Sequence, residues 1–255
     1  MRAAVQISGE FRCLHLSLPS FQTHILDALQ ARGYTEIYIF CHCWKKERTE
    51  LGTFPFQGRG DWHSRIPVFA SEEGLSIYRP ASYLFETLEE VDCLKGRSRI
   101  LAMYYSIWMA NRIRQDFEKE HRLEFDLVIR YRTDLILEAN LLKDMPDEPS
   151  FLVIPKSTRA ETCDGPFESS DESHICDYLA YGTPETMNTY CSVFETWFPI
   201  PETPIGESCL AIHLKISGLK ALRTPVPFYL VEGDGKKRGV VYSKDLTALE
   251  NNPSE

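Results

Sequence analysis

The sequence predicts an α/β fold with a mostly parallel central sheet, helices on both faces of that sheet and a Rossmann-like N-terminal half. Two observations support this prediction. The first forty residues alternate strand, helix and strand, which is the pattern of a parallel βαβ unit. Further along, Leu127, Val128 and Ile129 form a continuous apolar run, which is typical of a strand covered on both faces.

Local patterns define the N-terminal elements. Residues 3–7 form an apolar run that predicts the first strand. Residues 19–31 carry apolar side chains at helical spacing, and Gly33 behind them is a natural C-terminal cap. Residues 36–40 predict the second strand. Residues 41–44 include two cysteines and a histidine, but their spacing does not match a zinc site and favours packing residues at a strand end.

The rest of the chain continues to alternate helices and strands. Residues 98–120 predict the longest helix, because apolar side chains recur along one stripe, and this helix leads into the central strand at residues 125–135. Two long polar stretches, residues 45–65 and 156–174, predict loops. The later expected elements are strands at residues 151–155, 177–182 and 227–231, a helix from Pro184 to about Trp197 that Thr183 caps, and a helix from residue 205 that Gly218 ends.

Length and composition indicate one folded unit. The chain has 255 residues, of which 43% are hydrophobic and 25% charged, as in ordinary globular proteins. We expect a single domain over residues 1–245 and a flexible tail over residues 246–255. The formal net charge is -9. Without a basic stripe, the chain is not expected to bind nucleic acid.

The sequence does not predict export or membrane insertion. Met1 and Arg2 lead directly into the first strand, so we expect no signal peptide. No window is apolar enough for a transmembrane segment. The eight cysteines are too sparse for a disulfide scaffold and indicate reduced, mostly buried thiols. We therefore expect a cytoplasmic protein.

Charged residues at the end of the central strand are the main functional candidates. Arg130, Arg132 and Asp134 alternate along the chain, so in an extended conformation all three would project from one side. Open α/β sheets bind their ligands at the carboxyl ends of the strands. Two guanidiniums and a carboxylate at that place would suit a metal-bound diphosphate. A surface ion pair that needs no ligand is the alternative interpretation.

The end of the first strand offers a second group of candidates. Gly9 follows Ser8 and permits close approach of a ligand. Arg12 is well placed to bind a phosphate or a carboxylate. An ordinary tight turn would explain the same short motif.

Several common motifs are absent, among them GxxxxGK[ST], GxGxxG, GxSxG and HExxH. The chain instead carries, in this order, VQISGEFR, IYIFCHCW, YYSIWMAN, DLVIRYRTDL, DYLAYGTPETM and PIGESCLAIHL. This ordered set resembles the WavE-type lipopolysaccharide-synthesis proteins and related glycosyltransferases of the GT-A fold. The set spans most of the chain, and DLVIRYRTDL is its most specific member.

The resemblance implies transfer of a sugar from a nucleotide-sugar donor to a glycan or lipid-linked acceptor. In that fold a DxD motif at a strand end holds Mn²⁺ or Mg²⁺ on the donor diphosphate. Here Arg132 replaces the first carboxylate of the motif, and Asp134 keeps the second as the expected metal ligand. Arg130 and Arg132 would bind the diphosphate, and a metal-independent enzyme is an open alternative. The segment 8–12, with Ser8, Gly9 and Arg12, would line the nucleotide pocket.

Two further acids receive roles from the same resemblance. Glu207 lies at the start of a predicted helix, where such enzymes often place the base that takes the proton of the acceptor hydroxyl. Its alternative role is to complement the helix dipole, which contributes about 0.3–1 kcal/mol. Asp177 would contact the donor or acceptor sugar, or would be a solvated acid at a strand end. An enzyme of this kind would be cytoplasmic, either free or peripheral at a membrane where acceptors are made.

Two rival functions remain open. A non-catalytic protein that binds a nucleotide-sugar or glycan is supported by the replaced first carboxylate at Arg132. A sugar nucleotidyltransferase would need a glycine-rich, lysine-bearing loop, which residues 8–12 lack. The transfer hypothesis depends on Asp134 and its neighbouring arginines binding pyrophosphate. The hypothesis falls if Asp134 lies far from any cavity, or if it is enclosed with its neighbouring arginines in a closed set of internal ion pairs.

Overall fold

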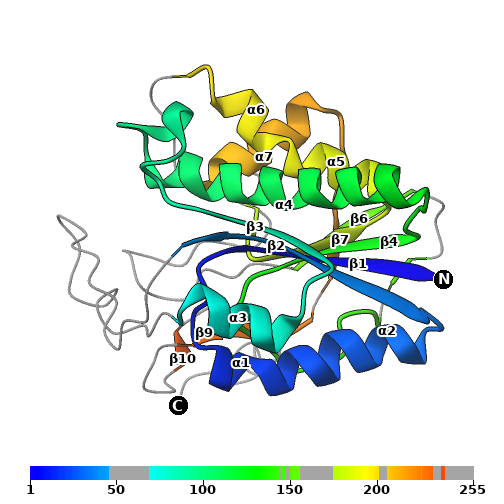
Figure 1. Ribbon diagram of the computed structural model, residues 1–255. Helices are drawn as coiled ribbons and strands as arrows, with labels where there is room; N and C mark the ends of the chain where they lie inside the picture. The colour runs from blue at the N-terminus through cyan, green and yellow to red at the C-terminus, as the bar shows by residue number, and fades with distance from the viewer. Residues whose placement is uncertain are drawn as a thin grey trace, which may run out of the picture.

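A seven-stranded sheet forms the centre of the molecule (Figure 1). The structure is a computed structural model and describes residues 1–45, 69–143, 145–146, 150–155, 175–200, 206–224, 226–231 and 237–238. The strands of this sheet are β1 (Arg2–Gly9), β2 (Glu36–Trp44), β3 (Ser82–Glu86), β4 (Leu127–Tyr131), β6 (Leu152–Pro155), β7 (Leu179–Gly182) and β8 (Leu222–Thr224). Their order across the sheet is β3-β2-β1-β4-β7-β6-β8.

Strand directions make the sheet mixed but mostly parallel. β3, β2, β1 and β4 pair in parallel with their neighbours, whereas β7 is antiparallel to both β4 and β6. β6 and β8 again pair in parallel. β6 therefore runs in the direction of β4, and its carboxyl end lies beside the amino end of β7. A smaller sheet contains β5 (Leu135–Leu137), β9 (Phe228–Val231) and β10 (Lys237–Arg238).

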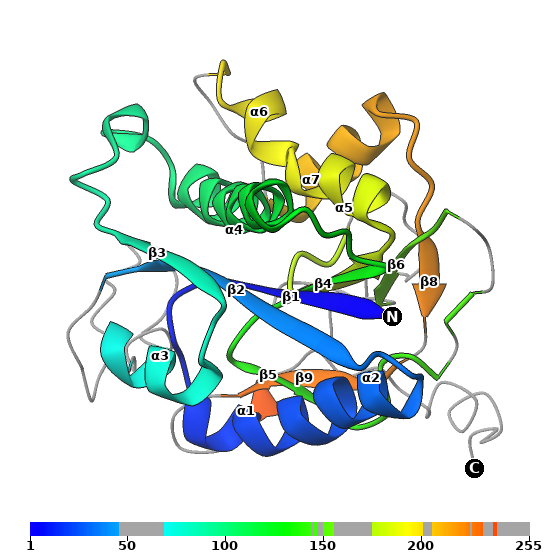
Figure 2. The same ribbon diagram turned by 45° about the vertical axis from the view of Figure 1, so that its right-hand side comes forward.

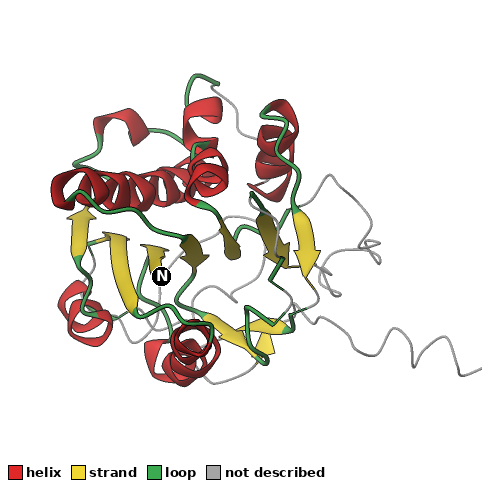
Figure 3. Ribbon diagram, turned by 90° about the vertical axis from the view of Figure 1, so that its right-hand side faces the viewer, coloured by secondary structure: helices red, strands yellow, loops and turns green. Residues whose placement is uncertain are grey.

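Helices cover both faces of the large sheet (Figures 2 and 3). The helices on one face are α4 (Arg99–His121), α5 (Pro184–Cys191), α6 (Val193–Trp197) and α7 (Gly206–Ile216). Those on the other face are α1 (Leu14–Phe21), a π-helical turn (Gln22–Leu26), α2 (Asp27–Ala31) and α3 (Ser71–Tyr78). The prediction of an α/β fold with a mostly parallel sheet and helices on both faces is confirmed.

The sheet divides the hydrophobic core into two layers. Val5 and Ile7 of β1 pack on the side of α1 with Ile25, while Ala4 packs on the side of α4 with Tyr104. This alternation is the two-residue period of a strand, and it persists in β4. Gln6 is fully buried on the α4 side, so polar groups enter that layer toward the end of β1.

Several predicted boundaries are close to the observed ones. The predicted helix at residues 98–120 is α4, and the Ser98 hydroxyl caps it by accepting a hydrogen bond from the Leu101 backbone N–H at 3.2 Å. Thr183 caps α5 as expected. The first helix begins earlier than predicted, at Leu14, with Pro19 inside its first two turns. The expected helix up to Trp197 is divided at Ser192 into α5 and α6.

Other predictions concern segments that the structure does not describe. Apart from Lys45, the loop at residues 45–65 lies outside the described residues, as do the loop at 156–174 and the tail at 246–255. Among the described residues, no helix is both long enough and apolar enough to cross a membrane. The seven cysteines within the described ranges are all free thiols.

Candidate functional site

Two chain segments meet at the carboxyl edge of the central sheet. β1 and β4 pair in parallel and in register, so both strands end at this edge. Beyond it, the Thr133 hydroxyl donates a hydrogen bond to the Glu10 carbonyl at 2.8 Å and accepts one from the Arg12 backbone N–H at 3.0 Å. The Ser17 hydroxyl donates to the Thr133 carbonyl at 2.5 Å. These bonds fix the turn after β4 against the turn after β1.

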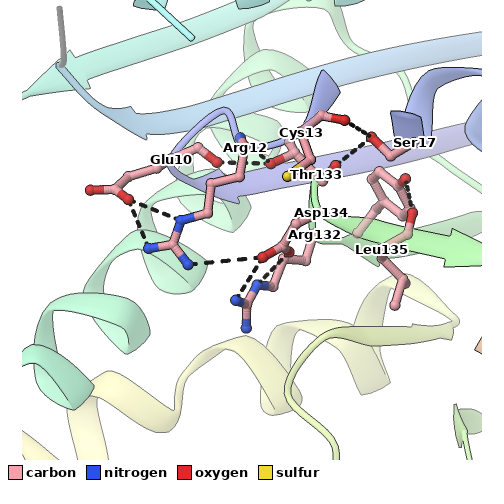
Figure 4. A network of polar contacts seen from close by, with 9 residues as sticks. Glu10, Arg12, Cys13, Ser17, Arg132, Thr133, Asp134 and Leu135 are labelled. Atoms are coloured by element: carbon pink, nitrogen blue, oxygen red, sulfur yellow. Dashed lines mark hydrogen bonds and ion pairs between the residues drawn. The ribbon is translucent and has the colours of Figure 1, made fainter. Parts of the chain in front are cut away.

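Four charged side chains at this edge form an alternating row of ion pairs (Figure 4). Arg12 Nη2 lies 2.7 Å from Glu10 Oε2, and Arg12 Nη1 lies 3.9 Å from Asp134 Oδ2. Arg132 holds the same carboxylate with two nitrogens: its Nε is 2.7 Å from Asp134 Oδ1, and its Nη2 is 2.9 Å from Oδ2. The Arg132 guanidinium carbon also lies 4.7 Å from the centre of the Tyr178 ring. The two acids thus balance two of the arginines.

Asp134 is a buried and ionised carboxylate. It is only 1% exposed, and burial alone would raise its pKa. The positive charges of Arg132 and Arg12 outweigh burial and hold the pKa of Asp134 below its usual value. Burial would lower the pKa of Arg132, but the attraction of Asp134 reverses this and raises it. Both groups therefore keep their charges at neutral pH.

Arg130 stands apart from this row of ion pairs. The extended strand ends at Tyr131 and the chain turns at Thr133 and Asp134, so the extended conformation that would project all three charges from one side does not form. Arg130 is 2% exposed. Its Nε and Nη1 atoms have no hydrogen-bond partner among the residues that the structure describes. Burial lowers the pKa of Arg130, and Tyr190 and Asp177 oppose that shift.

The surroundings of Arg130 contain further polar groups without partners. Arg130 pairs in register with Gln6 of β1, and Ser8 lies one step further along the same face of that strand. Within the described part of the chain, the Ser8 Oγ and the Tyr190 hydroxyl are buried and form no hydrogen bond. Asp177, two residues before β7, is also buried. Arg130 is therefore a buried cation with unused donors close to other unused hydroxyls.

A second buried arginine on the same face shows the contrasting arrangement. Arg114 of α4 is fully buried, yet its Nη1 donates to Glu118 Oε2 at 2.5 Å and its Nη2 donates to Asn111 Oδ1 at 3.0 Å. It also bonds to Asn188 of α5. Gln6 joins this network by donating to Asn111 at 2.8 Å. Every part of this guanidinium is used inside the fold, unlike that of Arg130.

A histidine cluster lies beside Ser8 on the neighbouring strand. His42, the register partner of Ser8, is fully buried, with its Nδ1 2.8 Å from Ser106 Oγ and its Nε2 2.9 Å from Glu86 Oε2. The Tyr105 hydroxyl donates to the same Glu86 oxygen at 3.0 Å. His42 is therefore held from both sides and is no metal ligand in this arrangement.

The predicted metal site does not fit the groups at this edge. Both oxygens of Asp134 lie within ion-pair distance of Arg132, although Oδ1 has no hydrogen-bond partner among the described residues, and Glu10 is held by Arg12. Among the described residues, no three His, Cys, Asp or Glu side chains gather as a possible metal-binding group. A divalent metal ion here would lie near three guanidiniums, and both carboxylates of the row are already paired with arginines.

The predicted site residues mostly share one edge of the sheet. The ones placed there are Ser8, Gly9, Arg12, Arg130, Arg132, Asp134 and Asp177. Gly9 has a φ of 107°, a conformation that glycine adopts easily, and an added Cβ there would meet no atom within 4 Å. Glu207 lies in the first turn of α7, and its side chain is outside the described residues.

No protein-family model and no curated protein matches the chain. The site must therefore be interpreted from its own geometry. Sequence reasoning missed three of its members: Glu10, Thr133 and Tyr190. Glu10 lies in the segment 8–12 that contains Arg12, and its place two residues before that arginine could have identified it as a partner. Tyr190 lies about sixty residues from Arg130 on another element, and no sequence signal connects the two.

Proposed function

We propose that the chain binds a nucleotide-sugar through its diphosphate at the carboxyl edge of β1 and β4, and transfers the sugar to a glycan or lipid-linked acceptor. The observation that carries this proposal is the buried guanidinium of Arg130, whose Nε and Nη1 have no hydrogen-bond partner among the described residues. An unpaired buried charge costs several kcal/mol. A fold that keeps one beside unused hydroxyls is best explained by an anion that binds there.

A diphosphate suits the groups at this edge. Guanidinium donors match phosphate oxygens in pairs, and Arg12 and Arg132 bring two further positive charges to the same edge as Arg130. The Ser8 and Tyr190 hydroxyls are free to donate to phosphate oxygens. When the sugar leaves, negative charge grows on the diphosphate, and fixed donors stabilise that charge. The same groups therefore serve binding and transfer.

Sugar transfer also requires groups for the acceptor. In this proposal Glu207 takes the proton of the acceptor hydroxyl if the reaction inverts the sugar carbon. Asp177 contacts a sugar hydroxyl, and its position two residues before β7 supports this role because that strand begins opposite the end of β4. The GT-A resemblance of the sequence is the basis for choosing glycosyl transfer among reactions of diphosphate esters.

A non-catalytic nucleotide-sugar-binding protein is the second candidate. The observation that favours it is the enclosure of Asp134, the only carboxylate that the altered DxD motif retains, between Arg132 and Arg12. Such a protein would bind the donor and leave it intact. Release of nucleoside diphosphate from the nucleotide-sugar in the presence of an acceptor distinguishes the two functions.

The binding step is tested by thermal unfolding of the full chain with UDP, GDP, CDP and ADP and with the corresponding nucleotide-sugars. We expect at least one of them to raise Tm, since a ligand at 100 times its Kd stabilises the folded state by about 2.7 kcal/mol. Arg130→Met should remove this increase. Arg114→Met is the matched control: it removes a paired guanidinium from the same face and should keep the ligand-induced increase.

Two results would overturn the proposal. One is an unchanged Tm with every nucleotide and nucleotide-sugar. The other is an Arg130→Met variant that retains the full ligand-induced increase, because Arg130 is the group on which the assignment rests.

A further inference from the structure

We propose that the donor diphosphate is neutralised here by guanidinium groups without a divalent metal, and that Asp134 is the internal counter-ion of Arg132 and Arg12 rather than a metal ligand. This inference rests on the proposed function, because it concerns how the same site holds its ligand. It departs from the metal-dependent mechanism that the sequence resemblance implies.

Asp134 is already in contact with two arginines. Arg132 approaches both of its oxygens, at 2.7 Å and 2.9 Å, and Arg12 lies 3.9 Å from Oδ2. Asp134 is buried, so solvent does not compete for these contacts. Only Oδ2 accepts a hydrogen bond from Arg132; Oδ1 has no hydrogen-bond partner among the described residues. A metal ion at Oδ1 would lie against the Arg132 Nε that is 2.7 Å from the same oxygen, and the two cations would repel each other.

The other acid in the row of ion pairs, Glu10, is also paired and does not replace Asp134 as a metal ligand. Glu10 Oε2 accepts hydrogen bonds from two nitrogens of Arg12, at 3.0 Å and 2.7 Å. It therefore lies on the far side of Arg12 from Asp134 (Figure 4). No group of three potential metal ligands occurs within the described ranges. Divalent metals such as Mg²⁺ are usually held by carboxylates together with phosphate oxygens, and this edge has no uncommitted carboxylate in the row.

The balance of charge also argues against a metal. Within the row, Glu10 and Asp134 balance Arg12 and Arg132. The buried Asp177 attracts Arg130 and opposes the fall in its pKa, but Nε and Nη1 of Arg130 have no hydrogen-bond partner among the described residues. A diphosphate would use these donors, whereas a dication would be repelled by the guanidiniums beside it. The unused donors of Arg130 therefore favour an anion that arrives without its own metal.

The transfer step balances without a metal. The bond between the anomeric carbon and the diphosphate oxygen breaks, and its electron pair remains on that oxygen, where the guanidiniums stabilise the charge. The acceptor oxygen forms the new bond to the anomeric carbon and gives its proton to a protein base. The products are a glycoside and a nucleoside diphosphate.

The test measures nucleotide binding to the wild-type chain by titration calorimetry, once in excess EDTA and once in MnCl₂. The probe is whichever of UDP, GDP, CDP and ADP raises Tm. We expect the two Kd values to agree within about threefold. A Kd that is at least about tenfold weaker in EDTA would overturn the inference and leave the proposed function standing. Failure of every nucleotide to bind in both buffers would instead remove the proposed function and the inference together.

A variant separates the two roles of Asp134 by the sign of its effect. A metal ligand at this position predicts that Asp134→Asn weakens binding in MnCl₂. An internal counter-ion predicts that Asp134→Asn binds the nucleotide at least as tightly as wild type, because the site loses a negative charge. Asp116→Asn, on the exposed side of α4, makes the same change in net charge away from the site and should leave Kd unchanged. If Asp134→Asn does not fold, the comparison of EDTA and MnCl₂ on the wild-type chain still decides.

Discussion

At the scale of single residues, two buried arginines on one face of the sheet have opposite environments. Arg114 is bonded to Glu118, Asn111 and Asn188, whereas Nε and Nη1 of Arg130 have no hydrogen-bond partner among the described residues. Buried charge is tolerated when it is paired and costly when it is not. The same substitution should therefore destabilise the chain much more at position 114 than at position 130.

Arg114→Met should lower the free energy of unfolding by about 3 kcal/mol, because it leaves Glu118 without its buried partner. Arg130→Met should lower that free energy by less than about 1 kcal/mol, because Nε and Nη1 of Arg130 have no hydrogen-bond partner among the described residues to lose and only the attraction of Asp177 is removed. Urea unfolding at neutral pH measures both. Lys215→Met, at an exposed position of α7, is the control and should change stability by less than about 0.5 kcal/mol. Strong destabilisation by Arg130→Met would show that Arg130 has a structural partner.

His42 should make stability depend on pH below neutrality. Burial lowers the pKa of His42, and Glu86 only partly opposes that shift. The ring contacts Glu86 of β3, Tyr105 and Ser106 of α4, and Trp44 of its own strand. Because the folded pKa is below the unfolded one, the unfolded chain binds the proton first. Stability is complete above about pH 6.5 and falls below it, by at most about 1.4 kcal/mol per pH unit for this one proton.

His42→Gln should make the fall in the free energy of unfolding between about pH 7 and about pH 5 shallower. Urea unfolding at several pH values in this range measures the fall. His213 also has a pKa lowered by burial, so part of the fall should remain. His15→Gln, at an exposed position, is the control and should keep the wild-type slope. An unchanged slope in His42→Gln would mean that His42 does not titrate differently in the two states.

At the scale of elements, α3 lies directly against the segment that carries Arg12. A Cβ added to Gly74 of this helix would overlap the ring of Phe11, which is buried, stacks on Tyr78 at 5.9 Å and meets Phe85 at 6.1 Å. Phe11 directly precedes Arg12. The close approach of helix and loop is therefore possible only because position 74 has no side chain.

Gly74→Ala should destabilise the chain by about 1–3 kcal/mol through overpacking, although alanine in a helix is usually favoured over glycine by about 1 kcal/mol. Ser76→Ala in the same helix is exposed and should change stability by less than about 0.5 kcal/mol. Thermal and urea unfolding measure both. An increase in stability for Gly74→Ala would contradict the close packing of α3 on Phe11.

The elements also show what a sequence can and cannot predict. The helix at residues 98–120 was predicted to within about one residue, because Ser98 and a regular apolar stripe are local signals. The direction of β7 was not predictable, because a short apolar strand reads the same in a parallel or an antiparallel sheet. β3 at the sheet edge is only partly buried, and its pattern gave no strong signal.

The candidate site shows the same limit. The spacing of Arg130, Arg132 and Asp134 identified an arginine-rich strand end, and that edge does gather the other predicted residues. Arg130 does not project together with Arg132 and Asp134, because the chain turns after β4. The Thr133 hydroxyl holds this turn by donating a hydrogen bond to the carbonyl of Glu10, 123 residues earlier in the chain. Such a contact comes from the tertiary fold and leaves no local pattern.

At the scale of the whole molecule, net charge and site charge have opposite signs. The chain carries a formal net charge of -9, while its candidate ligand is an anion bound by arginines. At low salt the screening length is about 30 Å, so the whole protein repels the nucleotide during approach, whereas at physiological salt it is about 8 Å. The buried guanidiniums act at short range and are screened less.

The association rate of a fluorescent nucleoside diphosphate should therefore rise by about two- to fivefold between low and physiological salt. Stopped-flow mixing measures this rate. The uncharged nucleoside with the same dye is the control and should show no such change. A rate that falls with salt would indicate that an open basic surface guides the ligand.

The reversed direction of β7 has a final consequence for the candidate site. Because β7 runs antiparallel to β4, its first residue, Leu179, pairs with Tyr131 at the end of β4. Asp177 therefore lies at the edge where β1 and β4 end. In a parallel orientation the chain would enter β7 from the opposite edge, and the same acid would lie a full strand length away from Arg130.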